Sequence, residues 1–255
     1  MNELFSLQGR TALVTGGSRG IGRMIAKGFL TQGARVYISS RKAAACEDTV
    51  KELSALGPCF ALPADVSTVD GARALAAAYA VRETSLDILV NNAGAAWGES
   101  FGTFPEKGWD KVMDLNLKSP FFLTQALHEL LSAAGRARPA KVINIASIDG
   151  VSVNPQETYS YAASKAGLIH LTKRMSLRLA KDNIMVSGIA PGAFASDMNR
   201  DARDHGDEVA RRIPAGRIGT DEDMAGVAIY LASRAGDYVV GETIVVDGGV
   251  TLARG

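Results

Sequence analysis

The sequence has few cysteines, no long hydrophobic run and almost no net charge, and each scarcity excludes a class of protein. Cys46 and Cys59 are the only cysteines in 255 residues, which is too few for a disulfide framework. The longest apolar run, residues 74–81, is much shorter than the roughly 20 residues of a membrane-spanning helix. Residues 1–10 contain no basic segment followed by an apolar one, so we expect no signal peptide and a cytoplasmic location.

Charge and composition exclude further classes. With 28 Lys and Arg against 27 Asp and Glu, the net charge is +1, which predicts neither a nucleic-acid partner nor a membrane-surface partner. The 3 histidines stand far apart and no Cys/His spacing is typical of zinc, so no metal site is predicted. Apolar residues (47%) and charged residues (22%) are near the globular average. With 27 glycines, 8 prolines and no composition break, the chain is expected to form a single domain over residues 1–255.

Short β-type runs alternate with longer helical patterns along the chain. The runs are mostly continuous apolar stretches, which is typical of strands buried on both faces of a parallel sheet. Strands are predicted at residues 11–15, 35–40, 59–63, 86–91, 141–146, 185–190 and 243–246, and helices at 20–32, 43–56, 69–83, 109–134, 159–181 and 221–232. This alternation favours right-handed βαβ units and a doubly wound α/β fold.

A glycine-rich turn follows the first predicted strand. Residues 15–22 read TGGSRGIG, and an amphipathic helix begins there. Gly16, Gly20 and Gly22 would allow a tight turn and a close approach of the backbone to a pyrophosphate, which the helix N-terminus would bind. The strand before the motif and the helix after it distinguish it from an ordinary glycine-rich turn. The sequence therefore predicts a dinucleotide-binding site here.

Further motifs follow the glycine-rich turn in order along the chain. They are DV at residues 65–66, NNAG at 91–94, Asn116, Ser147, YAASK at 161–165, PG at 191–192 and DGG at 247–249. Together with the turn, these motifs resemble those of the classical short-chain dehydrogenase/reductase family over nearly the whole chain. Within the family, the sequence is most similar to the NADPH-dependent 3-oxoacyl reductases, including the branch associated with rhamnolipid synthesis. The resemblance implies a three-layer Rossmann fold, in which a doubly wound seven-stranded parallel sheet carries helices on both faces.

The resemblance also implies which residues bind a nicotinamide dinucleotide. Asp65 and Val66 would flank the adenine, while residues after the fourth strand and around the PG motif would line the rest of the cofactor. The residues so implied are Gly16, Ser18, Arg19, Gly20, Ile21, Gly22, Asp65, Val66, Asn92, Ala93, Gly94, Pro191, Gly192, Phe194 and Ser196, together with Tyr161 and Lys165.

The end of the second predicted strand indicates which nicotinamide cofactor is used. NAD-binding relatives carry an acidic residue there, which binds the adenosine ribose hydroxyls. This chain instead has Ser40 followed by Arg41 and Lys42, a hydroxyl and two cations that suit a 2′-phosphate. Arg19 could approach the same phosphate from the glycine-rich turn. NADP(H) is therefore predicted; the alternative is that Arg41 and Lys42 only begin a solvated helix.

A Tyr-x-x-x-Lys pair opens a predicted helix after the strand that leads to Ser147. Tyr161 and Lys165 are four residues apart, so they share one helix face and can reach one ligand. A phenol has a pKa near 10, which an adjacent ammonium together with an oxidised nicotinamide ring would lower. By resemblance, Tyr161 protonates the carbonyl oxygen that Ser147 holds, and Lys165 tunes Tyr161 and binds the nicotinamide ribose. Asn116 is implied to hold a water that connects the lysine to solvent.

The expected activity is the NADPH-dependent reduction of a ketone to a secondary alcohol, with a 3-oxoacyl thioester as substrate. A dehydrogenase of a sugar, a polyol or another secondary alcohol is the first alternative, and a non-catalytic NADP(H)-binding sensor is the second. The complete Asn/Ser/Tyr/Lys set argues against a sensor, which needs only the glycine-rich turn. Substrate selection is expected in Trp97, in residues 149–156 and in residues 193–216, where Phe194 and Met198 would add an apolar lining.

The sequence also leads to expectations about a carrier-protein contact, oligomer assembly and a mobile segment. Arg136, Arg138 and Lys141 could meet an acidic acyl carrier protein, although a solvated helix end also explains them. The helices at 109–134 and 159–181 have more apolar surface than one sheet contact can cover, so a homo-oligomer is predicted, with a homotetramer ahead of a dimer. Residues 193–216 are dense in charge, so they are expected to form a mobile lid that orders over bound cofactor and substrate. The alternative for that segment is a permanently folded pair of charged helices.

Overall fold

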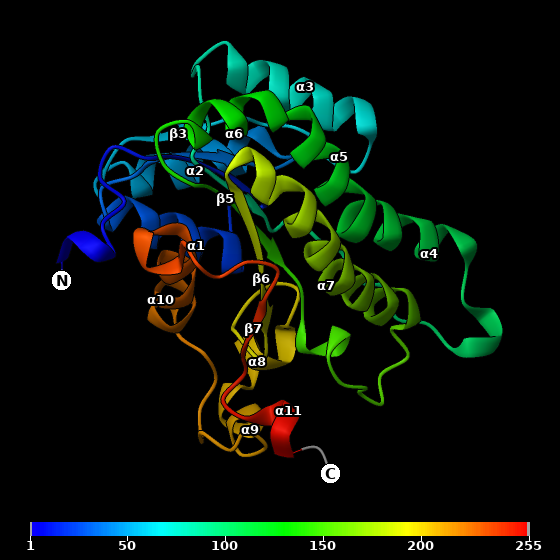
Figure 1. Cartoon of the computed structure of the whole chain (residues 1–255). Coiled ribbons are helices and arrows are strands. Elements are labelled where there is room, and N and C mark those ends of the chain that lie inside the picture. Colours follow the sequence, from blue (N-terminus) through cyan, green and yellow to red (C-terminus); the bar gives the residue numbers. More distant parts are fainter. Residues whose placement is uncertain (1, 254–255) are drawn as a thin grey trace.

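Seven short runs form one fully parallel β-sheet in the computed structural model, which describes residues 2–253 (Figure 1). The strands are β1 (Thr11–Thr15), β2 (Arg35–Ser39), β3 (Cys59–Ala61), β4 (Ile88–Asn91), β5 (Ala140–Ile145), β6 (Ile184–Pro191) and β7 (Thr243–Val246). Their order across the sheet is β3-β2-β1-β4-β5-β6-β7. The chain therefore winds outward from β1 in one direction and from β4 in the other. This confirms the predicted doubly wound, seven-stranded parallel sheet.

Helices cover both faces of the sheet (Figure 1). On one face, α1 (Gly20–Thr31), α2 (Ala43–Leu53) and α10 (Asp221–Ala232) form a core with alternate strand residues such as Val14 and Ile38. On the other face, α3 (Val69–Ala80), α5 (Ser119–Ala126), α6 (His128–Gly135) and α7 (Tyr159–Leu179) pack against the intervening residues, such as Leu13 and Leu89. Because successive strand side chains point to opposite faces, a strand such as β1 supplies both cores, whereas the edge strand β7 contributes only to the first.

The predicted single helix at 109–134 is wrong. The structure has α4 (Glu106–Met113), a π-helical turn (Asp114–Lys118), α5 and α6 in its place. Pro120 lies in the first turn of α5, where a missing backbone N–H is tolerated. Leu127 leaves helical geometry at φ −95° and ψ 3° and separates α5 from α6. The apolar periodicity continues across these breaks, which explains why the sequence pattern concealed them.

Residues 193–216, expected to be irregular, contain two short helices. These are α8 (Arg200–Asp204) and α9 (Gly206–Ala210). Asn199 caps α8, because its side-chain oxygen accepts the N–H of Ala202 at 3.1 Å. The backbone therefore follows the helix-pair alternative, while the mobility of the segment stays a prediction. A last helix, α11 (Val250–Ala253), ends the described chain; residues 1, 254 and 255 of the predicted domain lie outside it.

No helix within residues 2–253 combines the length and the apolar character needed to cross a membrane. The cytoplasmic location stays a prediction.

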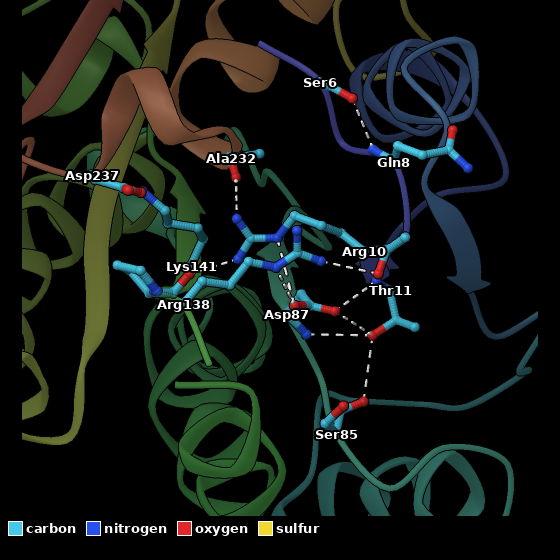
Figure 2. A network of polar contacts seen from close by, with 12 residues as sticks. Ser6, Gln8, Arg10, Thr11, Ser85, Asp87, Arg138, Lys141, Ala232 and Asp237 are labelled. Carbon is cyan, nitrogen blue, oxygen red and sulfur yellow. Dashed lines mark hydrogen bonds and ion pairs between the residues drawn. The ribbon is translucent and has the colours of Figure 1, made fainter. Parts of the chain in front are cut away.

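Buried charges fasten the amino edge of the sheet (Figure 2). Arg10, which is buried just before β1, donates hydrogen bonds to the carbonyls of Ala232 at 3.2 Å and Pro139 at 2.6 Å. Its Nε lies 3.6 Å from Oδ1 of Asp87, whose other oxygen accepts the backbone N–H of Thr11 at 2.8 Å. The guanidinium therefore joins the C-terminal end of α10 to the starts of β1, β4 and β5.

A second ion pair lies beside the first and involves Lys141, one residue of the basic cluster expected to meet a carrier protein. Lys141 is buried at the start of β5, and its Nζ is 2.8 Å from Oδ1 of Asp237. Burial lowers the pKa of Lys141, and Asp237 opposes that shift. Arg138 pairs with Asp87 at 3.5 Å. Of the three residues of the expected basic cluster, Lys141 is therefore inaccessible to a carrier protein, and Arg138 is already paired with Asp87.

We expect Asp87→Ala to destabilise the fold by about 3–5 kcal/mol, because it leaves the buried Arg10 guanidinium without its carboxylate. Urea unfolding measures the loss. Asp70→Ala, which removes an exposed i,i+3 pair with Arg73, is the control and should leave the free energy of unfolding unchanged within error. A loss below about 1 kcal/mol for Asp87→Ala would show that the network does not hold the amino edge together.

Candidate active site

A cavity of 780 Å³ opens at the carboxyl edge of the sheet. Its walls come from the loops that follow β1, β2, β4, β5 and β6. In doubly wound sheets the loops diverge where the winding direction reverses, here between β1 and β4, and this divergence leaves a crevice for ligands. The cavity volume lies within the usual range for ligand sites.

The glycine-rich turn forms one wall of the cavity. Gly16 and Gly20 adopt left-handed conformations, with φ of 65° and 51°, which other residues rarely adopt. A Cβ on Gly16 would also lie 2.7 Å from Nδ2 of Asn92. Gly22 is buried behind the turn and does not line the cavity; a Cβ there would lie 2.4 Å from the Gly16 carbonyl oxygen. Arg19, the N-cap of α1, makes no side-chain cap, so its side chain does not occupy the first N–H groups of the helix.

Polar side chains that follow β2 also line the cavity. They belong to Ser40 and Arg41, and Arg19 of the glycine-rich turn lines the same cavity. The Arg19 guanidinium pairs with Asp197 at 2.7 Å, so the structure ties the glycine-rich turn to the 193–216 segment. The buried hydroxyl of Ser39, also in the cavity wall, finds no hydrogen-bond partner among the described residues. This oxygen has almost no accessible surface, so the residue contributes to the wall without offering its hydroxyl to the cavity.

Thr15 positions the NNAG segment, a role that the sequence reasoning missed. Its Oγ1 accepts the backbone N–H groups of Asn92 and Ala93, each at 3.0 Å, and donates to the Val90 carbonyl at 3.2 Å. The Asn92 side chain donates back to the Thr15 carbonyl at 2.9 Å. These bonds hold the ends of β1 and β4 together below the cavity. Its position in the sequence indicated this role, because Thr15 directly precedes the glycines of the turn.

Ser147, Tyr161 and Lys165 line the same cavity. Ser147 follows β5, and its Oγ accepts the N–H of Asp149 at 3.1 Å, which caps a short 3-10 helix (Ile148–Gly150). Tyr161 and Lys165 lie in the first two turns of α7. The Lys165 Nζ lies 5.7 Å from the centre of the Tyr161 ring and donates to the Ile145 carbonyl at 2.7 Å. A serine, a tyrosine and a lysine from two elements are thus brought to one place.

Burial sets the protonation of the two titratable groups. Desolvation raises the pKa of Tyr161 to about 12; its hydrogen bond with Ser147 acts in the opposite direction, and the Asp149 charge adds to the rise. Desolvation lowers the pKa of Lys165 to about 8. In the chain alone, removal of the phenol from water dominates its pKa. The lowering expected from the ammonium together with an oxidised nicotinamide ring stays a prediction. Tyr161 is a neutral phenol with a proton to give.

Asn116 lies behind the cavity rather than in its wall. It belongs to the π-helical turn and is buried, and its Oδ1 accepts the Ala95 N–H at 2.8 Å. Its Nδ2 donates to the Ala95 carbonyl at 2.9 Å and to Ser164 Oγ at 3.0 Å. Ser164 in turn donates to the Tyr161 carbonyl at 2.8 Å, so it links Asn116 to the tyrosine turn of α7. The sequence reasoning missed Ser164, although it stands inside the YAASK motif.

Among the residues predicted for catalysis or for cofactor binding, Gly22, Lys42 and Asn116 do not contribute to the cavity wall. Those that do are Gly16, Ser18, Arg19, Gly20, Ile21, Ser40, Arg41, Asp65, Val66, Asn92, Ala93, Gly94, Ser147, Tyr161, Lys165, Pro191, Gly192, Phe194 and Ser196.

The expected substrate-selecting residues divide into two groups. Asp149, Gln156 and Met198 line the cavity. Trp97 does not line it, because the ring packs on the backbone of Gly108, where a Cβ would lie 2.8 Å from three ring atoms. The ammonium of Lys111 lies 5.2 Å from the ring centre. Trp97 is therefore a packing residue for α4.

Comparison with known proteins identifies the family. Residues 16–251 match the family described as enoyl-(acyl carrier protein) reductase. The chain belongs to the short-chain dehydrogenase/reductase family and is an oxidoreductase of that family.

Individual relatives cover nearly the whole chain. The rhamnolipids biosynthesis 3-oxoacyl-[acyl-carrier-protein] reductase of Pseudomonas aeruginosa is 48% identical over 99% of this chain and 100% of its own length. The 2-dehydro-3-deoxy-D-gluconate 5-dehydrogenase of Escherichia coli is 41% identical over 98% of each chain. Among solved structures, the active-site complex of Pseudomonas aeruginosa RhlG with NADP superposes with a TM-score of 0.95 at 47% identity, covering 98% of this chain and 100% of that one.

The lowered pKa of Lys165 has a consequence for stability. Its pKa is about 8 in the folded chain against 10.5 for an unburied lysine, so burial of the ammonium costs stability at every pH below about 8. Between these two values the unfolded chain binds more protons than the folded one, so the cost disappears as the pH rises. Without nucleotide, we expect Lys165→Met to be more stable than the wild type at pH 7, by about 1–3 kcal/mol in urea unfolding. The difference should shrink toward pH 10.5.

Lys173→Met, at an exposed position of the same helix, is the matched control and should show no such pH dependence. A stability difference that stays constant from pH 7 to pH 10.5 would contradict the lowered pKa of Lys165.

Proposed function

We propose that this protein reduces the ketone of a 3-oxoacyl thioester to a secondary alcohol with NADPH. The observation that carries the proposal is that Ser147, Tyr161 and Lys165 share one cavity with the glycine-rich turn. The relative that is 48% identical over its full length bears the name of a 3-oxoacyl-[acyl-carrier-protein] reductase, which supports the substrate class.

The residues present fit NADP(H). The glycine-rich turn with the N-terminus of α1 would hold the diphosphate, and Ser40, Arg41 and Arg19 would hold the 2′-phosphate. The end of β2 carries no carboxylate that would repel that phosphate. When bound, the nicotinamide supplies the hydride.

The chain's own groups would supply the proton and the orientation. Ser147 Oγ would donate a hydrogen bond to the substrate carbonyl oxygen and hold it beside Tyr161. As hydride reaches the carbonyl carbon, that oxygen takes the phenol proton of Tyr161, whose raised pKa keeps it protonated at neutral pH. Lys165 would stabilise the phenolate left behind and bind the ribose hydroxyls. The Ala95 and Ser164 contacts of Asn116 would hold the tyrosine turn in place.

The cavity wall supports an acyl substrate without excluding a polar one. The 193–216 side contributes the apolar residues Phe194, Met198, Val209 and Ile213, and it also contributes polar and charged ones, among them Asp197, Arg200 and Arg212. Asp149 on the opposite loop also lines the cavity, and the 41% identical relative is named as a dehydrogenase of a sugar acid. A sugar or polyol dehydrogenase is therefore the second candidate.

The function is tested by comparing kcat/KM values among carbonyl substrates, with the reaction monitored by the absorbance of NADPH. We expect 3-oxoacyl thioesters to exceed diketones and sugar-derived ketones, and Tyr161→Phe to lower kcat by about 10²–10⁴-fold. Tyr159→Phe is the matched control, since Tyr159 begins the same helix, lies outside the cavity wall and bonds Glu157; its kcat should not change. Dominance of a sugar-derived ketone would replace the acyl proposal by the second candidate.

We further propose that residues 193–216 act as a lid. Phe194, Ala202 and Ile213 are buried, but most other side chains of the segment are exposed or half-buried and many are charged. Its ion pairs, such as Arg203 with Asp197 at 2.6 Å, are on the surface and add little stability. Because the segment follows Pro191 in the cavity wall, ligand contacts can bias its position.

Amide hydrogen exchange measures the mobility of residues 193–216. Amides of residues 193–216 should exchange faster than those of β5 and should slow when NADPH is added, because contacts with the bound nucleotide disfavour local opening. Strong protection without nucleotide, unchanged by NADPH, would show that the segment is permanent scaffold.

We also propose that the protein assembles as a homotetramer. Leu177 on α7 is 70% exposed, and Phe121 on α5 is 38% exposed. Apolar side chains on two neighbouring helices would be covered by symmetric contacts with other copies. Light scattering should give the mass of four chains, and a monomer mass at all concentrations would contradict the assembly.

A further inference from the structure

The inner face of α2 contacts two separate parts of the cavity wall. Cys46, Thr49 and Leu53 are the buried residues of this helix, and their spacing places them on one side of it. Leu53 packs in the core, whereas Cys46 contacts Ser40 and Thr49 contacts Ser18. Neither Cys46 nor Thr49 lines the cavity, so both act on it only through these partners.

The Cys46 thiol controls the hydroxyl of Ser40. The two atoms, Sγ and Oγ, lie 3.0 Å apart, and the cysteine is fully buried, so its side chain has no solvent to turn to. Ser40 Oγ also lies 3.4 Å from the Lys42 carbonyl, which can only accept a hydrogen bond. Either atom of the Sγ–Oγ pair can be the donor, and the thiol has a second acceptor in the Ser40 carbonyl at 3.9 Å. A phosphate can only accept, so Ser40 would give its single proton to a bound phosphate, and the thiol would then donate to Ser40 Oγ and hold it in that orientation.

Thr49 acts on the other part of the wall. Its Oγ1 lies 2.9 Å from the Ser18 carbonyl in the glycine-rich turn and 2.8 Å from the Ala45 carbonyl of its own helix. A hydroxyl between two carbonyls can only donate, so it holds the turn against α2. The glycine-rich turn would contact the diphosphate, which NADPH and NADH share. The Ser40 contact, in contrast, concerns the position where the two cofactors differ, which is a 2′-phosphate in NADPH and a ribose hydroxyl in NADH.

We propose that Cys46 is a positioning residue for cofactor selectivity: it orients Ser40 toward the 2′-phosphate and so favours NADPH over NADH. The proposal rests on the NADP(H) dependence proposed above. Thr49 is the matched comparison, because it bonds the glycine-rich turn, which would contact the diphosphate of both cofactors. Selectivity thus depends on a buried residue seven positions beyond the end of β2, in addition to the exposed Arg41.

Direct nucleotide binding tests the proposal without any carbonyl substrate. Dissociation constants for NADPH and NADH are measured by calorimetry on the wild type, Cys46→Ala, Cys46→Ser and Thr49→Val, with urea unfolding as a check on the fold. We expect Cys46→Ala to weaken NADPH binding about three- to tenfold, the range of one neutral hydrogen bond, and NADH binding less than twofold. Cys46→Ser keeps a donor and should restore the NADPH/NADH ratio to within about twofold of the wild type. Thr49→Val should weaken both nucleotides by similar factors.

The possible results separate this inference from the proposed function. A wild type that binds NADH more tightly than NADPH would overturn the NADP(H) dependence and the inference with it. A wild type that prefers NADPH, with the same ratio in Cys46→Ala, would overturn only the inference. Equal weakening of both nucleotides by Cys46→Ala and Cys46→Ser would likewise show that the cysteine acts through packing alone. If Cys46→Ala does not fold, Cys46→Val fills the space without a donor and should give the same selective loss of NADPH binding.

Discussion

The site depends on one constraint, the reversal of winding direction between β1 and β4 in a fully parallel sheet. Parallel strands present all their carboxyl ends at one edge, and the loops that leave β1 and β4 must diverge to opposite faces. The divergence leaves the crevice into which the glycine-rich turn, Ser40, Ser147 and the start of α7 converge. Thr15 keeps that crevice narrow at its base, because its one hydroxyl joins the ends of both strands.

The two edges of the sheet use polar groups in different ways. At the amino edge, two ion pairs hold strand starts and a helix end together. Arg10 pairs with Asp87, and Lys141 pairs with Asp237. At the carboxyl edge, the Ser39 hydroxyl has no partner among the described residues and the Tyr161 phenol keeps its proton. A buried polar group without a partner destabilises a core, whereas the Tyr161 phenol lines the cavity and can donate its proton to a ligand there.

Support for the site comes from residues that do not touch it. Asn116 and Ser164 hold the tyrosine turn from behind, and Cys46 and Thr49 contact the cavity wall at Ser40 and Ser18 from α2. Each side chain is buried and makes one to three hydrogen bonds, which fix its orientation because no solvent competes. The chemistry is thereby carried by few residues, while its geometry is shared among elements far apart in the sequence.

The sequence by itself determined the fold class and most of the cavity wall. Alternating apolar strands and amphipathic helices specify a doubly wound sheet, and the glycine positions specify a turn that only they can adopt. Tertiary structure alone decided which side chains face the ligand: Gly22 and Asn116 lie behind the wall, Trp97 packs on Gly108, and Lys141 is buried with Asp237. It also broke the helix expected at 109–134 and raised the pKa of Tyr161. Local pattern fixes periodicity and turn chemistry, whereas burial and long-range pairing depend on neighbours that the chain brings together only on folding.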